Sequence, residues 1–167
     1  KNTPTFIPRI MGDSFWRLKQ PVTGGFTGLH QAMETIDFLR CGIEGLNLFS
    51  KGVIERCLTS GSHPSQITVL GGGARNRFWI TNKADILGQP LYLPEIEEAS
   101  AVGAALLAGV GSGIYSGHQE GMEIATALPV RVVEPNPARS REWNEIYQQR
   151  FLPALQMMHE ADIQPSK

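Results

Sequence analysis

The sequence has little cysteine and no excess of positive charge. It holds two cysteines, Cys41 and Cys57, which cannot build a disulfide framework, so we expect a reducing compartment and a cytoplasmic protein. Fifteen Lys and Arg residues stand against sixteen Asp and Glu residues, for a formal net charge of -1. Because no basic excess is available to neutralise a run of phosphates, the composition argues against a nucleic-acid-binding protein.

Metal-ligand clusters and membrane spans are also missing from the sequence pattern. The four histidines are scattered, and no Cys or His pair has zinc-ligand spacing, so we expect no metal site. The longest uncharged run, residues 99–117, has the length of a membrane span. It is rich in Gly and Ser and has no flanking Lys or Arg, which argues against membrane insertion.

Glycine is the residue in surplus, with 18 in 167 residues against an average of about 7%. With 41% hydrophobic residues, the chain is long enough to form one domain. It begins with Lys1 instead of Met and shows no targeting segment. We therefore expect a piece of a longer protein.

The hydrophobic pattern predicts an α/β fold with short strands and long helices. Apolar residues at steps of three and four, interrupted at Ser50, predict a long helix over residues 31–58 with this stripe facing the core. The stripe consists of Ala32, Ile36, Leu39, Ile43, Leu46, Val53 and Cys57.

Other elements follow from turn residues and capping signals. Residues 1–30 are expected to be extended chain and turns. The remaining predictions are strands at 66–70 and 91–93, a strand or extended arm at 130–133, and helices at 76–87, 99–110, 120–127 and 137–160. The small residues of the 99–110 helix predict close packing against a sheet.

Three consecutive glycines, Gly71, Gly72 and Gly73, connect a predicted strand to a predicted helix. Such a turn exposes backbone N–H groups, so a nucleotide could lie against the main chain. Asn76 could cap the following helix or hydrogen-bond the ligand. A plain tight turn is the alternative. A phosphate-binding P-loop is excluded, because Ala74-Arg75 follows the last glycine instead of Lys-Ser or Lys-Thr.

A dinucleotide-binding Rossmann loop remains a second alternative. Its third glycine is replaced by Asn76, although Glu95, Glu97 and Glu98 lie near the offset of the ribose-binding carboxylate. Arg75 and Arg77 could contact phosphate or ribose, but arginines beside a turn are more often solvated, so we expect them at the surface.

Five acidic residues outside residues 95–98 could act as acids or bases, but none has a partner at a spacing that would indicate a catalytic pair. These are Asp13, Glu34, Asp37, Glu44 and Asp85. Arg40 lies between Asp37 and Glu44 at helical spacing, which predicts an ion pair within the helix.

Several motifs, in order, resemble the C-terminal part of the FGGY carbohydrate kinases. They are Gly24-x-Phe26-x-Gly28-Leu29 with residues 37–45, the glycine loop 71–76, the helix exit 84–90, the small-residue helix 98–108 and the tail from Glu134. Cys41 and Gly42 depart from the family pattern, as does Asp13-Ser14 after Gly12.

The resemblance implies an incomplete ribonuclease H-like domain of the actin and hexokinase type over residues 1–167. In such kinases the sugar is held mainly by an N-terminal domain, which also carries the catalytic Asp, so no catalytic residue is assigned to this chain. ATP is expected along Gly71, Gly72, Gly73 and Asn76, with Mg²⁺ as its counter-ion. The isolated chain is expected to lack kinase activity.

The implied reaction is ATP-dependent phosphorylation of a ketose or polyol hydroxyl. A non-catalytic actin-like nucleotide-binding module remains an alternative. The sequence does not identify the sugar or the hydroxyl that is phosphorylated. It does not identify the oligomeric state either, and a homodimer is the candidate.

Overall fold

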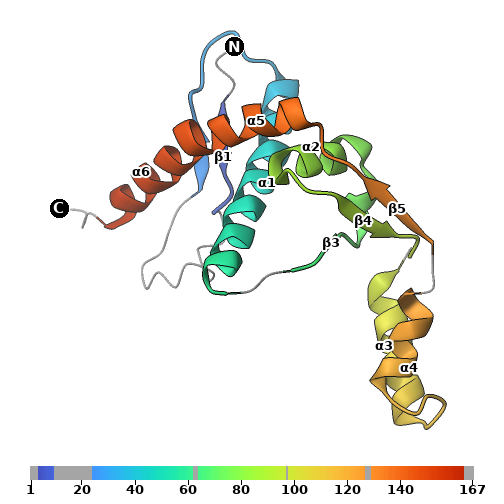
Figure 1. Cartoon of the computed structure of the whole chain (residues 1–167). Helices are drawn as coiled ribbons and strands as arrows, with labels where there is room; N and C mark the ends of the chain where they lie inside the picture. Colours follow the sequence, from blue (N-terminus) through green and yellow to red (C-terminus); the bar gives the residue numbers. More distant parts are fainter. Residues whose placement is uncertain (1–3, 10–23, 62–63, 97, 127–128, 164–167) are drawn as a thin grey trace. The chain divides into compact units, whose positions relative to one another are not determined.

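The computed structural model describes residues 4–9, 24–61, 64–96, 98–126 and 129–163 as a mixture of helices and short strands, which confirms the α/β prediction (Figure 1). The described residues form two compact units. The first lies within 1–63, 82–88 and 135–167, and the second within 64–81 and 89–134. Each unit is described separately.

The first unit contains a small hairpin and a long helix. Strands β1 (Thr5–Ile7) and β2 (Gly25–Thr27) pair antiparallel, with Phe6 opposite Phe26. Helix α1 (Thr35–Thr59) packs against β1. The expectation of extended chain in this region is confirmed where residues are described, and both strands add to those predicted.

Helix α1 begins four residues later than the pattern predicts. Glu34 is its N-cap and forms a capping box with Asp37, whose carboxylate accepts the Glu34 N–H at 3.0 Å. Glutamate is not among the preferred N-cap residues, so the sequence offers little warning of this start. The helix ends at Thr59, and Gly61 follows with a φ of +91°.

The prediction that the apolar stripe of α1 faces the core is wrong. Ile36, Leu39 and Leu46 are exposed, whereas the opposite face is buried. The buried residues of α1 are Cys41, Glu44, Gly45, Asn47, Leu48 and Gly52. Small residues lie on this face because α1 approaches β1 closely: a Cβ on Gly45 would overlap the Phe6 carbonyl. A prediction from hydrophobicity alone therefore selects the more apolar, exposed face of α1 as the one that meets the core.

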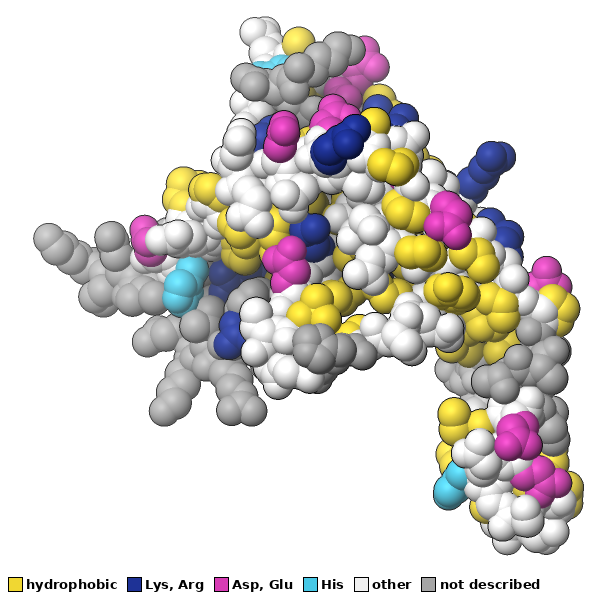
Figure 2. All heavy atoms as spheres, viewed as in Figure 1, with side chains coloured by type: hydrophobic (Ala, Val, Ile, Leu, Met, Phe, Trp, Pro, Cys, Tyr) yellow, Lys and Arg dark blue, Asp and Glu magenta, His cyan; other side chains and the backbone are white. Residues whose placement is uncertain are grey.

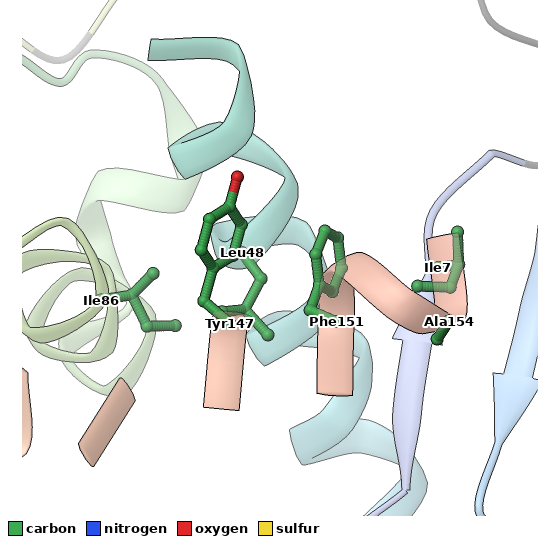
Figure 3. Packing of buried hydrophobic residues seen from close by; sticks show 6 residues of the cluster. All are labelled: Ile7, Leu48, Ile86, Tyr147, Phe151 and Ala154. Carbon is green, nitrogen blue, oxygen red and sulfur yellow. The ribbon is translucent and has the colours of Figure 1, made fainter. Parts of the chain in front are cut away.

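The core of the first unit is built from segments far apart in the sequence. It contains Ile7, Leu48, Ile86, Tyr147, Phe151 and Ala154 (Figure 3). The rings of Tyr147 and Phe151 lie side by side, with centroids 5.8 Å apart. Burial, together with the nearby Glu55 carboxylate, raises the pKa of Tyr147, so its hydroxyl stays neutral. Trp143 is partly buried and packs against this cluster.

The predicted C-terminal helix is a succession of three helical segments. Asn136 caps α5 (Pro137–Ile146) by accepting the N–H groups of Ala138 and Arg139, which confirms the predicted start. A π-helical turn, η2 (Tyr147–Phe151), then leads into α6 (Leu152–Ile163). Pro153 accounts for the wider turn, since it lacks the N–H that would bond the Gln149 carbonyl and its ring crowds that carbonyl.

The second unit contains a three-stranded sheet in the order β3-β4-β5. Strand β3 (Ile67–Thr68) pairs parallel with β4 (Leu91–Pro94), and β5 (Val130–Val133) pairs antiparallel with β4. Leu91 and Leu93 of β4 are buried. Other apolar side chains are exposed and gather on the visible face over β4 and β5 (Figure 2). All three predicted strands are present, and β3 is shorter than expected.

Helix α3 (Ala99–Gly111) packs against helix α4 (His118–Thr126) in this unit, in place of the expected sheet. Gly109 leaves room for the ring of Tyr115, which a Cβ at this position would overlap. Ala101, Ala104, Ala105 and Ala108 of α3 are not buried. Among the helices of the described residues, none has the length and apolar character needed to span a membrane.

Candidate functional site

The glycine loop follows strand β3 directly. The N–H of Val69 donates to the Tyr92 carbonyl of β4 at 2.9 Å, which holds the end of the strand. Gly71 then adopts a φ of +91°, a backbone conformation that side chains other than glycine rarely allow. This residue therefore turns the chain sharply from the sheet into the next element.

A single 3₁₀ turn, η1 (Gly72–Arg75), leads from the loop to helix α2 (Arg77–Leu87). The Ala74 N–H donates to the Gly71 carbonyl at 3.0 Å, and the Asn76 N–H donates to the Gly73 carbonyl at 3.2 Å. The side-chain oxygen of Asn76 accepts the Trp79 N–H at 3.1 Å. Asn76 thus caps α2, which was one of its two predicted roles.

Open space surrounds the first part of the loop. Gly71, Gly72 and Gly73 are exposed, and a Cβ built on Gly72 would meet no atom within 4 Å. The absence of a side chain at Gly72 is therefore not required by packing within the chain. Its main chain is accessible to a ligand, as the nucleotide-loop interpretation requires.

Arg131 contacts the loop from β5, and no sequence motif singles this residue out. One guanidinium nitrogen of Arg131 lies 3.5 Å from the Ala74 carbonyl oxygen and donates to it. The contact joins residues 57 positions apart, so no local motif could have revealed it. It brings a positive charge to the C-terminal end of the loop.

Helix α2 is anchored at its C-terminal half within the first unit. Asp85 is buried, accepts the Asn136 N–H at 2.8 Å and lies 3.7 Å from the Arg139 guanidinium. Asn82 accepts a hydrogen bond from the side chain of Asn47 at 2.8 Å, and both are buried. Asp85, a candidate acid or base in the sequence, is thereby occupied in structural contacts.

The other candidate acids have local partners. Arg40 pairs with Glu44 at 3.6 Å, which confirms the predicted ion pair within the helix, whereas Asp37 completes the capping box. Burial raises the pKa of Glu44, and the Arg40 charge opposes this shift. Asp13 lies outside the described residues. Arg75 and Arg77 are exposed, as expected.

Metal-binding groups do not gather in the part of the chain that is described. No three side chains of the His, Cys, Asp or Glu types come together there. These residues therefore do not fit a protein-built Mg²⁺ site. Cys41 and Cys57 form no disulfide.

A family model for the C-terminal domain of the FGGY family of carbohydrate kinases matches residues 1–112. The chain belongs to this family of phosphotransferases, whose fold is that of the actin and hexokinase-type ATPases. The expectation of an FGGY kinase domain is thereby confirmed.

The relatives of this chain include kinases for different substrates. The xylulose kinase of Staphylococcus epidermidis is 30% identical over 146 residues, which cover 87% of this chain and 28% of that protein. The crystal structure of the Rhodospirillum rubrum xylulose kinase matches with a TM-score of 0.75 at 27% identity, over 98% of this chain and 32% of the other.

A glycerol kinase of Plasmodium falciparum, solved with ADP, matches with a TM-score of 0.68 over 99% of this chain and 32% of the other. Its identity of 17% makes this a likeness in fold. In each comparison the chain spans less than a third of the relative's length.

Proposed function

We propose that this chain supplies the adenosine-binding side of an ATP-dependent sugar kinase that phosphorylates a hydroxyl of a ketose or polyol. Membership of the FGGY family supports the reaction class. The observation that carries the binding role is the exposed loop at Gly71, Gly72 and Gly73, which follows a strand, opens into a capped helix and leaves its main chain uncovered.

In this proposal the chain's own residues bind and orient the nucleotide. The main chain of Gly72 and Gly73 contacts the nucleoside, and Asn76 exchanges part of its capping role for a ligand contact. The ADP with which the Plasmodium falciparum glycerol kinase was crystallised supports an adenine nucleotide as the ligand. The Rossmann alternative has no matching relative among those described above.

Mg²⁺ enters the proposal only as the counter-ion of the triphosphate. Bound Mg²⁺ neutralises charge on the transferring phosphoryl group and usually keeps phosphate oxygens and waters among its ligands. The described residues contribute no cluster to hold it. We further propose that the catalytic base belongs to a separate sugar-binding domain outside these residues, and that the protein works in the cytoplasm as a homodimer. The chain spans less than a third of the length of the kinases it matches, which leaves room for such a domain.

Nucleotide binding by the 167-residue chain tests the proposal directly. We would compare ATP, ADP and NAD by calorimetry and by thermal shift, since a ligand at about 100 times its dissociation constant adds about 2.7 kcal/mol of stability. Binding of ATP and ADP, with none of NAD, is expected. NAD binding, or no nucleotide binding by a folded chain, would contradict the assignment.

Gly72→Val provides the residue-level test, with Gly111→Val as the matched control. Both glycines lie in the second unit, lack a positive φ and would place a Cβ in open space. Neither variant should crowd the fold, but the valine at position 72 covers the proposed binding surface. We expect ADP affinity to fall at least about tenfold, or 1.4 kcal/mol, in Gly72→Val alone.

The proposal also predicts that the isolated chain binds nucleotide without transferring phosphate. A coupled assay for ADP production should show no increase when xylulose or glycerol is added. Sugar-dependent ADP production by this chain would show that the base lies within it and would overturn that part of the proposal.

A further inference from the structure

Strand β5 carries an arginine on the packed face of its sheet. Arg131 lies directly opposite the buried Leu93 of β4, so the two side chains leave the sheet on the same face. Its neighbours Val130 and Val132 leave the sheet on the other face and are 45% and 43% exposed. A strand with one packed face normally places apolar residues on that face and polar residues on the other. Around Arg131 this order is inverted, which calls for an explanation.

The contact between Arg131 and the glycine loop explains this position. One guanidinium nitrogen of Arg131 donates to the Ala74 carbonyl at 3.5 Å. Ala74 lies in the 3₁₀ turn η1, and carbonyl groups near the end of a helical turn lack partners within it and carry negative partial charge. A positively charged donor is therefore a suitable partner for this carbonyl. The alternative is a purely structural role, since an inward-pointing charge can protect an outer strand from pairing with other chains.

Two contacts with neighbouring strands hold the glycine loop, one on each side of its three glycines. Before the glycines, the Val69 N–H donates to the Tyr92 carbonyl of β4 at 2.9 Å, and after them Arg131 of β5 holds Ala74. Between these two contacts residues 71–73 are exposed. Glycine loses more conformational freedom on ordering than any other residue. A loop that is already ordered in the free protein loses less of that freedom when a ligand binds, so it binds the ligand more tightly.

We propose that Arg131 is a positioning residue for the nucleotide loop: it holds the Ala74 carbonyl and so keeps the three glycines in the arrangement that binds the nucleotide. The inference rests on the proposed function, because it assigns a role in nucleotide binding to a residue that contacts the loop. It is a separate claim, since the loop could bind a nucleotide without help from β5. The contact is a single hydrogen bond from an exposed side chain, so its loss should weaken binding by about threefold to tenfold.

Substitutions at position 131 separate the hydrogen bond from the rest of the side chain. Arg131→Met keeps a long apolar side chain and removes the donor, whereas Arg131→Lys keeps a positively charged donor. Arg141→Met is the matched control, because it makes the same substitution at an exposed arginine of α5 in the first unit. Circular dichroism checks that each variant folds. Arg131→Thr, whose side chain suits a strand, replaces Arg131→Met if that variant does not fold.

Calorimetry with ADP on the full 167-residue chain measures the affinity. Arg131→Met should bind ADP about threefold to tenfold more weakly than wild type, and Arg131→Lys and Arg141→Met should stay within about twofold of wild type. Unchanged affinity in Arg131→Met would overturn the inference alone. An equal loss in Arg131→Lys would also overturn it, because one charged donor suffices for the contact. A wild-type chain that binds no ADP would overturn the proposed function, and this inference with it.

Hydrogen exchange without nucleotide tests the positioning role itself. Loss of the Ala74 contact should raise amide exchange over residues 71–76 in Arg131→Met, whereas Arg131→Lys should exchange like wild type. Faster exchange confined to β4 and β5 would indicate the purely structural role and overturn the proposal. Unchanged exchange over residues 71–76 together with weaker ADP binding would indicate that Arg131 contacts the nucleotide directly, which would also overturn it.

Discussion

Replacement of Gly45 by alanine probes the close approach of α1 to β1. A Cβ at this position would overlap the carbonyl of Phe6 and lie 2.9 Å from the Phe6 Cβ. The carbonyl belongs to the backbone of a paired strand, so it cannot move aside as a flexible side chain could. Overpacking of this kind costs about 1 to 3 kcal/mol, and the backbone contact favours the upper end.

Helix propensity acts in the opposite direction and must be subtracted. Alanine is favoured over glycine inside a helix by about 1 kcal/mol, so Gly45→Ala should destabilise the first unit by about 1 to 2 kcal/mol net. Gly42→Ala is the matched control, because it lies in the same helix and its Cβ would meet nothing within 4 Å. That variant gains the propensity term without the overlap. The two variants should therefore differ by about 2 to 3 kcal/mol.

Urea unfolding followed by circular dichroism measures this difference, at protein concentrations low enough to keep the chain monomeric. The midpoint should fall for Gly45→Ala and rise for Gly42→Ala, with similar slopes. Equal stability of the two variants would refute the reasoning, because it would mean that α1 and β1 are not in contact at Gly45 or that the strand moves at no cost.

Three further predictions concern other contacts. Asp85→Ala should cost about 1 to 3 kcal/mol in urea unfolding, because the Asn136 N–H loses its acceptor, whereas Arg139→Ala should cost less than about 1 kcal/mol. Burial raises the pKa of Glu44 above its usual 4.5, so the folded chain loses stability as pH rises through that raised pKa. Glu44→Gln should remove this loss, and its stability relative to wild type should increase from about pH 4 to about pH 7 in urea titrations. Gly109→Ala should displace the Tyr115 ring and raise hydrogen exchange in α3 and α4, at a net cost of about 0 to 2 kcal/mol once the gain of about 1 kcal/mol in helix propensity is subtracted.

Local signals in the sequence predicted most elements correctly. Asn136-Pro137 carries its own capping chemistry, so the start of α5 was predictable to the residue. The turn at Gly71 was predictable for the same reason, since three glycines between apolar segments have few other uses. In contrast, Glu34 resembles an ordinary surface residue until its partner Asp37 is seen to complete the capping box.

Contacts between distant segments were not predictable from one sequence. The apolar pattern of α1 is real, but which face meets the core depends on where β1 lies, and Gly45 decides this through a close backbone approach. The Arg131 contact with the glycine loop and the Asp85 contact with Asn136 also join residues more than 50 positions apart. The nucleotide loop could be located from the sequence, but its anchoring residues could not.

The composition of the core has a consequence for synthesis of the protein. Ile7 and Leu48 are translated before Tyr147 and Phe151, which pack against them and come more than 90 residues after Leu48. At about 5 to 20 residues per second, β1 and α1 wait several seconds on the ribosome without their covering rings. The first unit therefore completes its fold only after the segment around η2 has emerged. Until then the hairpin and α1 expose apolar surface of the kind that chaperones bind.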